Sequence, residues 1–209
     1  MALNKQQAAR LASRLWSDSE YATFAVLDGA GIAQLLDKLE DAPGLEFACL
    51  FELEIGSDIA HVAPYLVRVL PDSEFSAWLL AGWGERRGIF AQVPAALEMP
   101  MLRRHFRKLN IVYGDGLKAL LFRFYDPSVL RKQLPDCTPI QVRQIFGPVC
   151  RFVLENGAQG GVTMSATGSS ELVQEFFFQW CKKLFKRFIP FFQAASSTPA
   201  ARKSPSTNR

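Results

Sequence analysis

Short apolar runs and amphipathic repeats alternate along the first 130 residues of the chain. The apolar runs predict strands over residues 23–27, 45–53, 64–70, 88–92 and 118–125. Apolar positions with helical spacing predict helices over residues 1–16, 32–39, 73–81 and 94–109, with Asp72 or Ser73 as the N-cap of the third. This alternation favours a layered α/β arrangement with a largely parallel or mixed sheet.

The pattern changes beyond residue 127, where helices follow one another before a hairpin. Residues 128–134 and 139–146 are predicted to form short helices, and residues 149–155 and 161–166 a hairpin. The hairpin loop contains Asn156-Gly157, a dipeptide strongly preferred in tight turns. The expected fold class is α/β (mixed α+β), with a layered sheet flanked by helices, a C-terminal hairpin and an amphipathic aromatic helix. The first domain is expected to span residues 1–168.

The amphipathic aromatic helix is predicted over residues 169–193. On a helical wheel, apolar side chains such as Val173 and Leu184 share one face, and charged ones such as Glu171 and Lys186 the other. Ser169 or Ser170 is available as the N-cap, and Pro190 ends or kinks the helix. Residues 194–209 are mostly small, Pro or basic, which predicts a disordered tail.

The aromatic rings of this segment are too many for one helix face. Some are expected to pack on the protein body, and the rest would form an exposed patch rimmed by cations. Such a patch is typical of a partner surface or of a membrane interface. The candidate partner-binding residues are Phe177, Phe178, Trp180, Lys182, Lys183, Phe185, Lys186, Phe188 and Phe192.

Composition excludes several classes of protein. The 209 residues are 49% hydrophobic and 21% charged, which rules out wholesale disorder. A net charge of +4 is too small an excess to indicate a nucleic-acid partner. The four cysteines form no C-x-x-C pair, so a zinc site is not expected, and reduced thiols fit a cytoplasmic setting. No apolar run approaches the ~20 residues of a membrane span, and the first residues lack a signal core.

Few residues suggest catalysis, and no metal or cofactor is expected. The sequence contains no Walker A loop, G-x-G-x-x-G, G-x-S-x-G or H-E-x-x-H motif. Asp28-Gly29-Ala30-Gly31 loosely resembles a phosphate loop, but a tight turn after a strand explains it better. His61 and His105 lie in different contexts, and Cys49 and Cys150 lie in apolar strands. An enzyme using His105 or Asp28 is therefore the least favoured hypothesis.

A cluster of basic residues over 103–108 is a second candidate binding site. Its cations are Arg103, Arg104, Arg107 and Lys108, with His105 among them. One interpretation is a solvated helix end whose charges complement the helix dipole. The other is a site for an anion or an acidic partner.

The element Phe122-Arg123-Phe124-Tyr125-Asp126-Pro127 makes the sequence recognisable. With Val129-Leu130, Pro139, Gln141 and Phe146-Gly147-Pro148, it resembles the domain-of-unknown-function family of type VI secretion effector adaptors, also called effector chaperones. Further similarities lie at residues 25–30, 63–67, 83–84 and 88–90, so the resemblance runs from about residue 22 to 150.

The resemblance implies a cytoplasmic bacterial protein without catalytic activity. Such adaptors bind a toxic effector, often near its N-terminal region, and help load it onto the spike protein (VgrG-like) of the secretion machine. From the net charge and the lack of a long apolar run, no nucleic-acid partner and no stable membrane insertion are expected. The alternative from the residues alone is a peripheral membrane protein anchored by the cationic aromatic helix.

The family motif residues are expected to have structural roles rather than chemical ones. They are Asp28, Pro64, Tyr65, Arg123, Tyr125, Asp126, Pro127, Phe146, Gly147 and Pro148. Arg123 is expected to pair with Asp126 across the strand end, and Asp28 to cap the helix that follows it.

Overall fold

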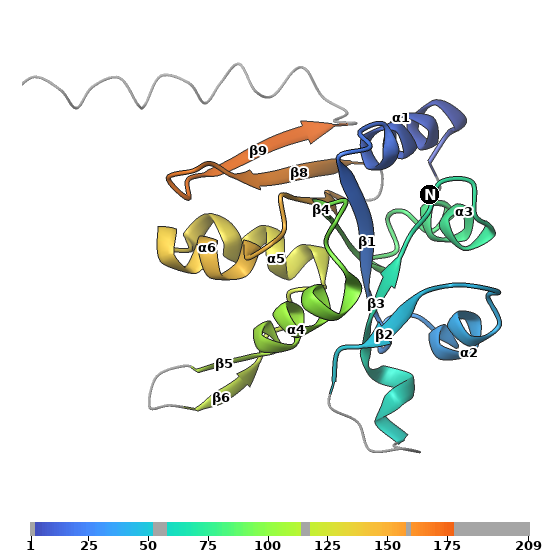
Figure 1. The fold of residues 1–209 in the computed structure, drawn as a ribbon, viewed down its shortest axis with the longest axis horizontal. Helices are drawn as coiled ribbons and strands as arrows, with labels where there is room; N and C mark the ends of the chain where they lie inside the picture. The colour runs from blue at the N-terminus through green and yellow to red at the C-terminus, as the bar shows by residue number, and fades with distance from the viewer. Residues whose placement is uncertain (1–2, 52–57, 114–117, 158–159, 178–209) are drawn as a thin grey trace, which may run out of the picture. The chain divides into compact units, whose positions relative to one another are not determined.

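Within the part of the chain that the structure describes, the main sheet has seven strands, and every strand pairing in it is antiparallel (Figure 1). The computed structural model describes residues 3–51, 58–113, 118–157 and 160–177. The strand order is β2 (Phe47–Cys49), β3 (Pro64–Arg68), β1 (Tyr21–Asp28), β4 (Gly88–Pro94), β7 (Arg151–Glu155), β8 (Gly161–Ala166) and β9 (Leu172–Phe177).

The expectation of a largely parallel or mixed sheet is wrong. A helix does connect two parallel strands, β3 and β4, but β1 lies between them and is antiparallel to both. β1 pairs with β3 on one side and with β4 on the other. The helix α3 (Glu74–Ala81) joins β3 to β4 and crosses β1, so the strands it connects are parallel to each other but are not neighbours. The mixed α+β class, with a layered sheet flanked by helices, is confirmed.

Helices cover both faces of this sheet. One face packs against α4 (Met99–Leu109), α5 (Pro127–Gln133), the short 3-10 helix η3 (Leu134–Asp136) and α6 (Pro139–Phe146). The other packs against α1 (Lys5–Trp16), α2 (Leu35–Glu40) and α3, and a 3-10 helix, η1 (Asp58–Val62), precedes β3. Figure 1 shows these two groups on opposite sides of β1 and β3. Two apolar cores result, one under each group of helices.

Local signals fix several helix starts. Ser73, rather than Asp72, caps α3, and its Oγ accepts a hydrogen bond from the Ser76 N–H at 3.1 Å. The helix expected from residue 94 begins only at Met99, because Pro94 still pairs with Tyr21 in the sheet. Pro100, not Pro94, is the proline in the first turn of α4.

The predicted hairpin is confirmed, but the aromatic helix expected to begin at residue 169 is wrong where the structure describes it. β7 and β8 pair across the Asn156-Gly157 loop, and β9 continues the sheet next to β8. Ser170 has φ +64 and lies in a turn, where the Ser170 N–H donates to the Thr167 carbonyl. Pairing with β8 satisfies the backbone of residues 172–177 as a strand. Residues 178–193 of the predicted helix and the predicted tail, 194–209, lie outside the described residues.

The strand expected over residues 118–125 is also different. Only Ala119–Leu121 forms a strand, β6, which pairs with β5 (Ile111–Tyr113) in a separate two-stranded sheet. Phe122, Phe124 and Tyr125 pack in or against the core while Arg123 stays exposed, and the Phe124 ring stacks on Phe106 with centroids 5.3 Å apart. Burial of Phe124 therefore ends the strand after Leu121.

Candidate functional site

Two buried carboxylates from the family motif form ion pairs at the end of β1. Asp28 pairs with Arg123, and Asp126 pairs with Arg86. Both aspartates are almost fully buried. The expected pairing of Arg123 with Asp126 is wrong, because Arg123 reaches the carboxylate at the end of β1 instead. Asp28 does not cap α2, whose N-cap is Gln34, but its Oδ1 accepts a hydrogen bond from the Ala30 N–H.

Asp126 is the N-cap of α5. Its Oδ1 accepts a hydrogen bond from the Ser128 N–H at 2.8 Å, and Pro127 occupies the first turn. Burial alone would raise the pKa of Asp126, but the hydrogen bonds from Ser128 and Arg86 outweigh it and hold the pKa below its usual value. The Asp-Pro end of the motif therefore starts a helix.

For Glu155, at the end of β7, burial outweighs the hydrogen bonds in setting the pKa, which is the reverse of Asp126. Burial raises the pKa of Glu155 despite the hydrogen bonds that it accepts from the Gly84 and Arg86 N–H groups. Arg131 donates to the Glu155 carbonyl at 2.9 Å and to Asn156 Oδ1 at 2.8 Å. These contacts tie α5 to the β7–β8 hairpin, and we interpret the ionic cluster as a structural joint.

The remaining motif residues contact the core or neighbouring backbone. Pro64 and Tyr65 lie in β3, and the Tyr65 hydroxyl donates to the Ala60 carbonyl at 2.9 Å. Burial raises the pKa of Tyr65 to about 12. Phe146 ends α6 and packs on Phe152, and Pro148 follows Gly147.

Gly147 brings His105 against the end of α6. It has φ +50, and a Cβ on it would lie 2.3 Å from the imidazole, so glycine is needed there. His105 Nε2 lies 3.0 Å from the Ile145 carbonyl, and burial lowers the pKa of His105. The ring therefore joins α4 to α6. His61 lies apart from it, on η1.

The described cysteines have raised thiol pKa values. Burial raises the pKa of Cys49, Cys137 and Cys150, and all three are free cysteines. A nucleophilic cysteine normally has a lowered pKa, because the thiolate is the reactive form. These environments favour packing over reactivity.

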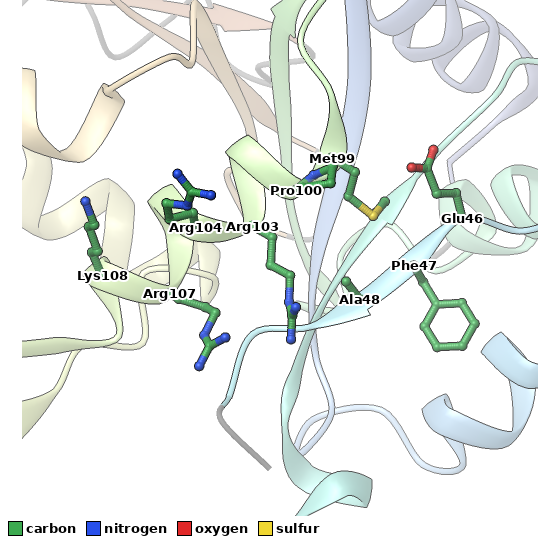
Figure 2. Close-up of a pocket in the computed structure, with 9 residues that line it drawn as sticks. All are labelled: Glu46, Phe47, Ala48, Met99, Pro100, Arg103, Arg104, Arg107 and Lys108. Atoms are coloured by element: carbon green, nitrogen blue, oxygen red, sulfur yellow. The ribbon is translucent and has the colours of Figure 1, made fainter. Parts of the chain in front are cut away.

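The basic residues of α4 line an open groove of about 750 Å³ beside β2 (Figure 2). Pro100, Arg103, Arg104, Arg107 and Lys108 share one helix face, since they recur at three- and four-residue intervals. Glu46, Phe47 and Ala48 of the β2 segment form the opposite wall, with Met99 between. The basic residues of this groove were therefore predicted from the sequence, but the edge of β2 that completes it was not.

The β5–β6 ribbon is an exposed apolar surface. Its large apolar side chains are exposed by between 39% (Val112) and 70% (Tyr113). They are Ile111, Val112, Tyr113, Leu120 and Leu121. At the root of the ribbon, the Phe122 N–H donates to the Asn110 carbonyl at 2.8 Å, and Phe122 packs on the core. We call these five residues the ribbon patch.

Sequence reasoning missed the ribbon patch, although a signal for it exists. Two short apolar runs flank Gly114-Asp115-Gly116, which is typical of a hairpin loop. The apolar run after the glycines instead fits the single longer strand expected over residues 118–125. Apolarity alone does not separate a buried strand from an exposed one.

The predicted C-terminal binding residues are largely outside the described part of the chain. Of that set, only Phe177 is described; it lies in β9, and Arg14 lies over its ring at 4.7 Å. Phe178, Trp180, Lys182, Lys183, Phe185, Lys186, Phe188 and Phe192 lie outside the described residues. Binding of a partner or of a membrane by this segment stays a prediction.

Residues 23–144 match the family described as "Domain of unknown function (DUF4123)", and the match covers more than half of the chain. The chain belongs to this family, which is generally linked to type VI secretion effector adaptors. The match contains the Phe122–Pro127 motif and ends just before Phe146. No curated protein and no solved structure matches the chain. Among the described helices, none combines the length and apolarity that crossing a bilayer requires.

Proposed function

We propose that this protein is a non-catalytic adaptor that binds a type VI secretion effector in the cytoplasm and helps load it onto the spike protein. Membership of a family linked to such adaptors supports the class of function. The ribbon patch is the observation that carries the proposal to this chain.

An exposed apolar surface of this kind supports protein binding. Both faces of the ribbon are apolar and exposed, since Ile111, Tyr113 and Leu121 lie on one face and Val112 and Leu120 on the other. An isolated two-stranded ribbon is at best marginally stable in water. A partner that covers the patch buries apolar area and stabilises the ribbon, which favours a protein client.

Substituting the ribbon patch is expected to weaken effector binding at least about tenfold, because a few well-packed residues near the centre of an interface carry most of the binding energy. One double variant carries Tyr113→Thr and Leu121→Thr, and the other Val112→Thr and Leu120→Thr. Threonine keeps a β-forming side chain at each position. Binding is measured by biolayer interferometry with the effector recovered from the bacterium that encodes this protein. At least one of the two variants is expected to lose binding.

The matched control carries Leu70→Thr and Ile140→Thr, two apolar residues exposed elsewhere. It is expected to bind like the unaltered protein. Equal binding by both ribbon variants and the control would remove the observation on which the proposal rests. Failure of the unaltered protein to bind any effector would contradict the function itself.

A further inference from the structure

The outer edge of β2 carries backbone groups that face the basic groove. The Arg68 N–H donates to the Glu46 carbonyl, and the Leu50 N–H to the Pro64 carbonyl, each at 2.9 Å. With Ala48 opposite Leu66, the backbone groups of residues 46, 48 and 50 therefore face β3. Those of Phe47 and Cys49 point the other way, out of the sheet.

One of these outward groups is already occupied. Arg103 of α4 donates from Nε to the Cys49 carbonyl at 2.9 Å, which fixes the helix beside the strand end. In the described part of the chain, no hydrogen bond reaches the outward N–H and C=O of Phe47. These groups are an open position for another strand, and Arg103 marks where that pairing would end.

The charges around the open edge have one predominant sign. Among the described residues that line the groove, four are cations of α4 and one is a carboxylate, Glu46, which pairs with Arg68 at 3.4 Å. Arg104 and Lys108 are exposed, and neither forms an ion pair with a carboxylate of the described residues. Figure 2 shows Arg103 and Arg107 directed toward the β2 side of the groove. The groove is therefore complementary to negative charge.

We propose that the groove binds an acidic, extended peptide segment that adds to the edge of β2. The segment forms a pair of backbone hydrogen bonds opposite Phe47, and its carboxylates meet the α4 cations. The open backbone edge favours a peptide over a nucleic acid, because a phosphodiester chain has no amide groups to pair with a strand. Assigning the segment to the effector rests on the proposed function, whereas the peptide preference rests on the groove alone.

Alternate N-methylation tests the strand pairing. The probe is a fluorescein-labelled hexapeptide of alternating Glu and Val, measured by fluorescence anisotropy with the full chain. In a strand, only every second amide faces the edge, so only one of the two alternately N-methylated isomers is expected to lose binding. Binding of the unmethylated probe is also expected to fall as salt rises. Equal binding by both isomers would overturn the strand pairing.

Charge reversal tests the cations. Arg104→Glu with Lys108→Glu is expected to weaken peptide binding at least about tenfold. The control, Lys5→Glu with Arg10→Glu, makes the same change in net charge at exposed positions of α1 and is expected to bind normally. Circular dichroism checks that both proteins fold. An equal loss in the control would show general charge attraction and overturn the site.

Two further results separate this inference from the proposed function. If the effector binds but the acidic peptide does not, the groove proposal is wrong and the adaptor function stands. If the peptide binds as expected and no effector binds, the groove stands and the function fails. Tighter binding of a 20-base-pair DNA duplex or of phosphatidylglycerol vesicles, lost in the Arg104/Lys108 variant, would overturn the peptide preference.

Discussion

Replacing Phe124 by alanine is expected to lower the free energy of unfolding by about 4 kcal/mol, the cost of deleting a buried aromatic ring. Phe124 is 0% exposed, stacks on Phe106, and meets the Tyr125 ring edge-on with centroids 5.5 Å apart. The cost includes a term for the cavity left behind, because the structure around a deleted side chain relaxes only partly. Urea unfolding followed by circular dichroism measures the loss.

The control for this variant is Phe176→Ala in β9. Phe176 is 44% exposed, so the same deletion is expected to cost under about 1 kcal/mol. Similar losses in the free energy of unfolding at the two positions would contradict the claim that Phe124 anchors the Phe122–Pro127 motif in the core.

Arg123→Met is expected to lower the free energy of unfolding by about 2 kcal/mol, because it leaves the Asp28 carboxylate buried without its cation. The value is below that of a fully buried pair, since the Arg123 side chain is 45% exposed while that of Asp28 is only 6% exposed. Asp28 also keeps its hydrogen bond from the Ala30 N–H. Thermal and urea unfolding of the variant provide the measurement.

Arg68→Met is a closely matched control for Arg123→Met. The Arg68 side chain is also 45% exposed, but its partner Glu46 is 47% exposed rather than buried. Exposed pairs contribute about 0–1 kcal/mol, so a loss near the lower end of that range is expected. If Arg68→Met lowers the free energy of unfolding as much as Arg123→Met does, burial of Asp28 does not determine how much the Asp28–Arg123 ion pair contributes to stability.

Local sequence signals predicted the elements whose cause is local. The Asn156-Gly157 hairpin, the Ser73 cap and the short helices α5 and α6 depend on residues within a few positions of one another. The buried strands β1, β3 and β4 were also recognisable, because their apolar runs are continuous.

Features set by distant partners were not predictable in the same way. The partner of Arg123 is Asp28, 95 residues away, and nothing in their local sequences distinguishes it from Asp126. Residues 172–177 carry a helix-like pattern, but pairing with β8 and the contact of Glu175 with Arg14 at 2.8 Å favour a strand. Tertiary pairing here overrides local periodicity.

The candidate binding surfaces show the same division. The cations of α4 were visible in the sequence as a possible site for an acidic partner. The open edge of β2 was not, because it depends on the place of that strand at the end of the sheet.

The ribbon patch and the basic groove are built on one continuous stretch of chain. α4 ends at Leu109 and β5 begins at Ile111. Between them, the buried Asn110 donates from Nδ2 to the Leu50 carbonyl at 2.8 Å, which fixes this junction to the end of β2. A client with an apolar region and an acidic extended segment could engage both surfaces, whose combined affinity would exceed that of either.

The most direct test of the adaptor function is the secreted protein content of the bacterium that encodes this chain. Mass spectrometry of the culture medium compares cells with and without the gene, and cells complemented with the unaltered protein or with a ribbon variant defective in binding. The account predicts that one effector disappears without the gene and returns only with the unaltered protein, while other products of the secretion machine continue to appear. An unchanged set of secreted proteins after removal of the gene would contradict the account.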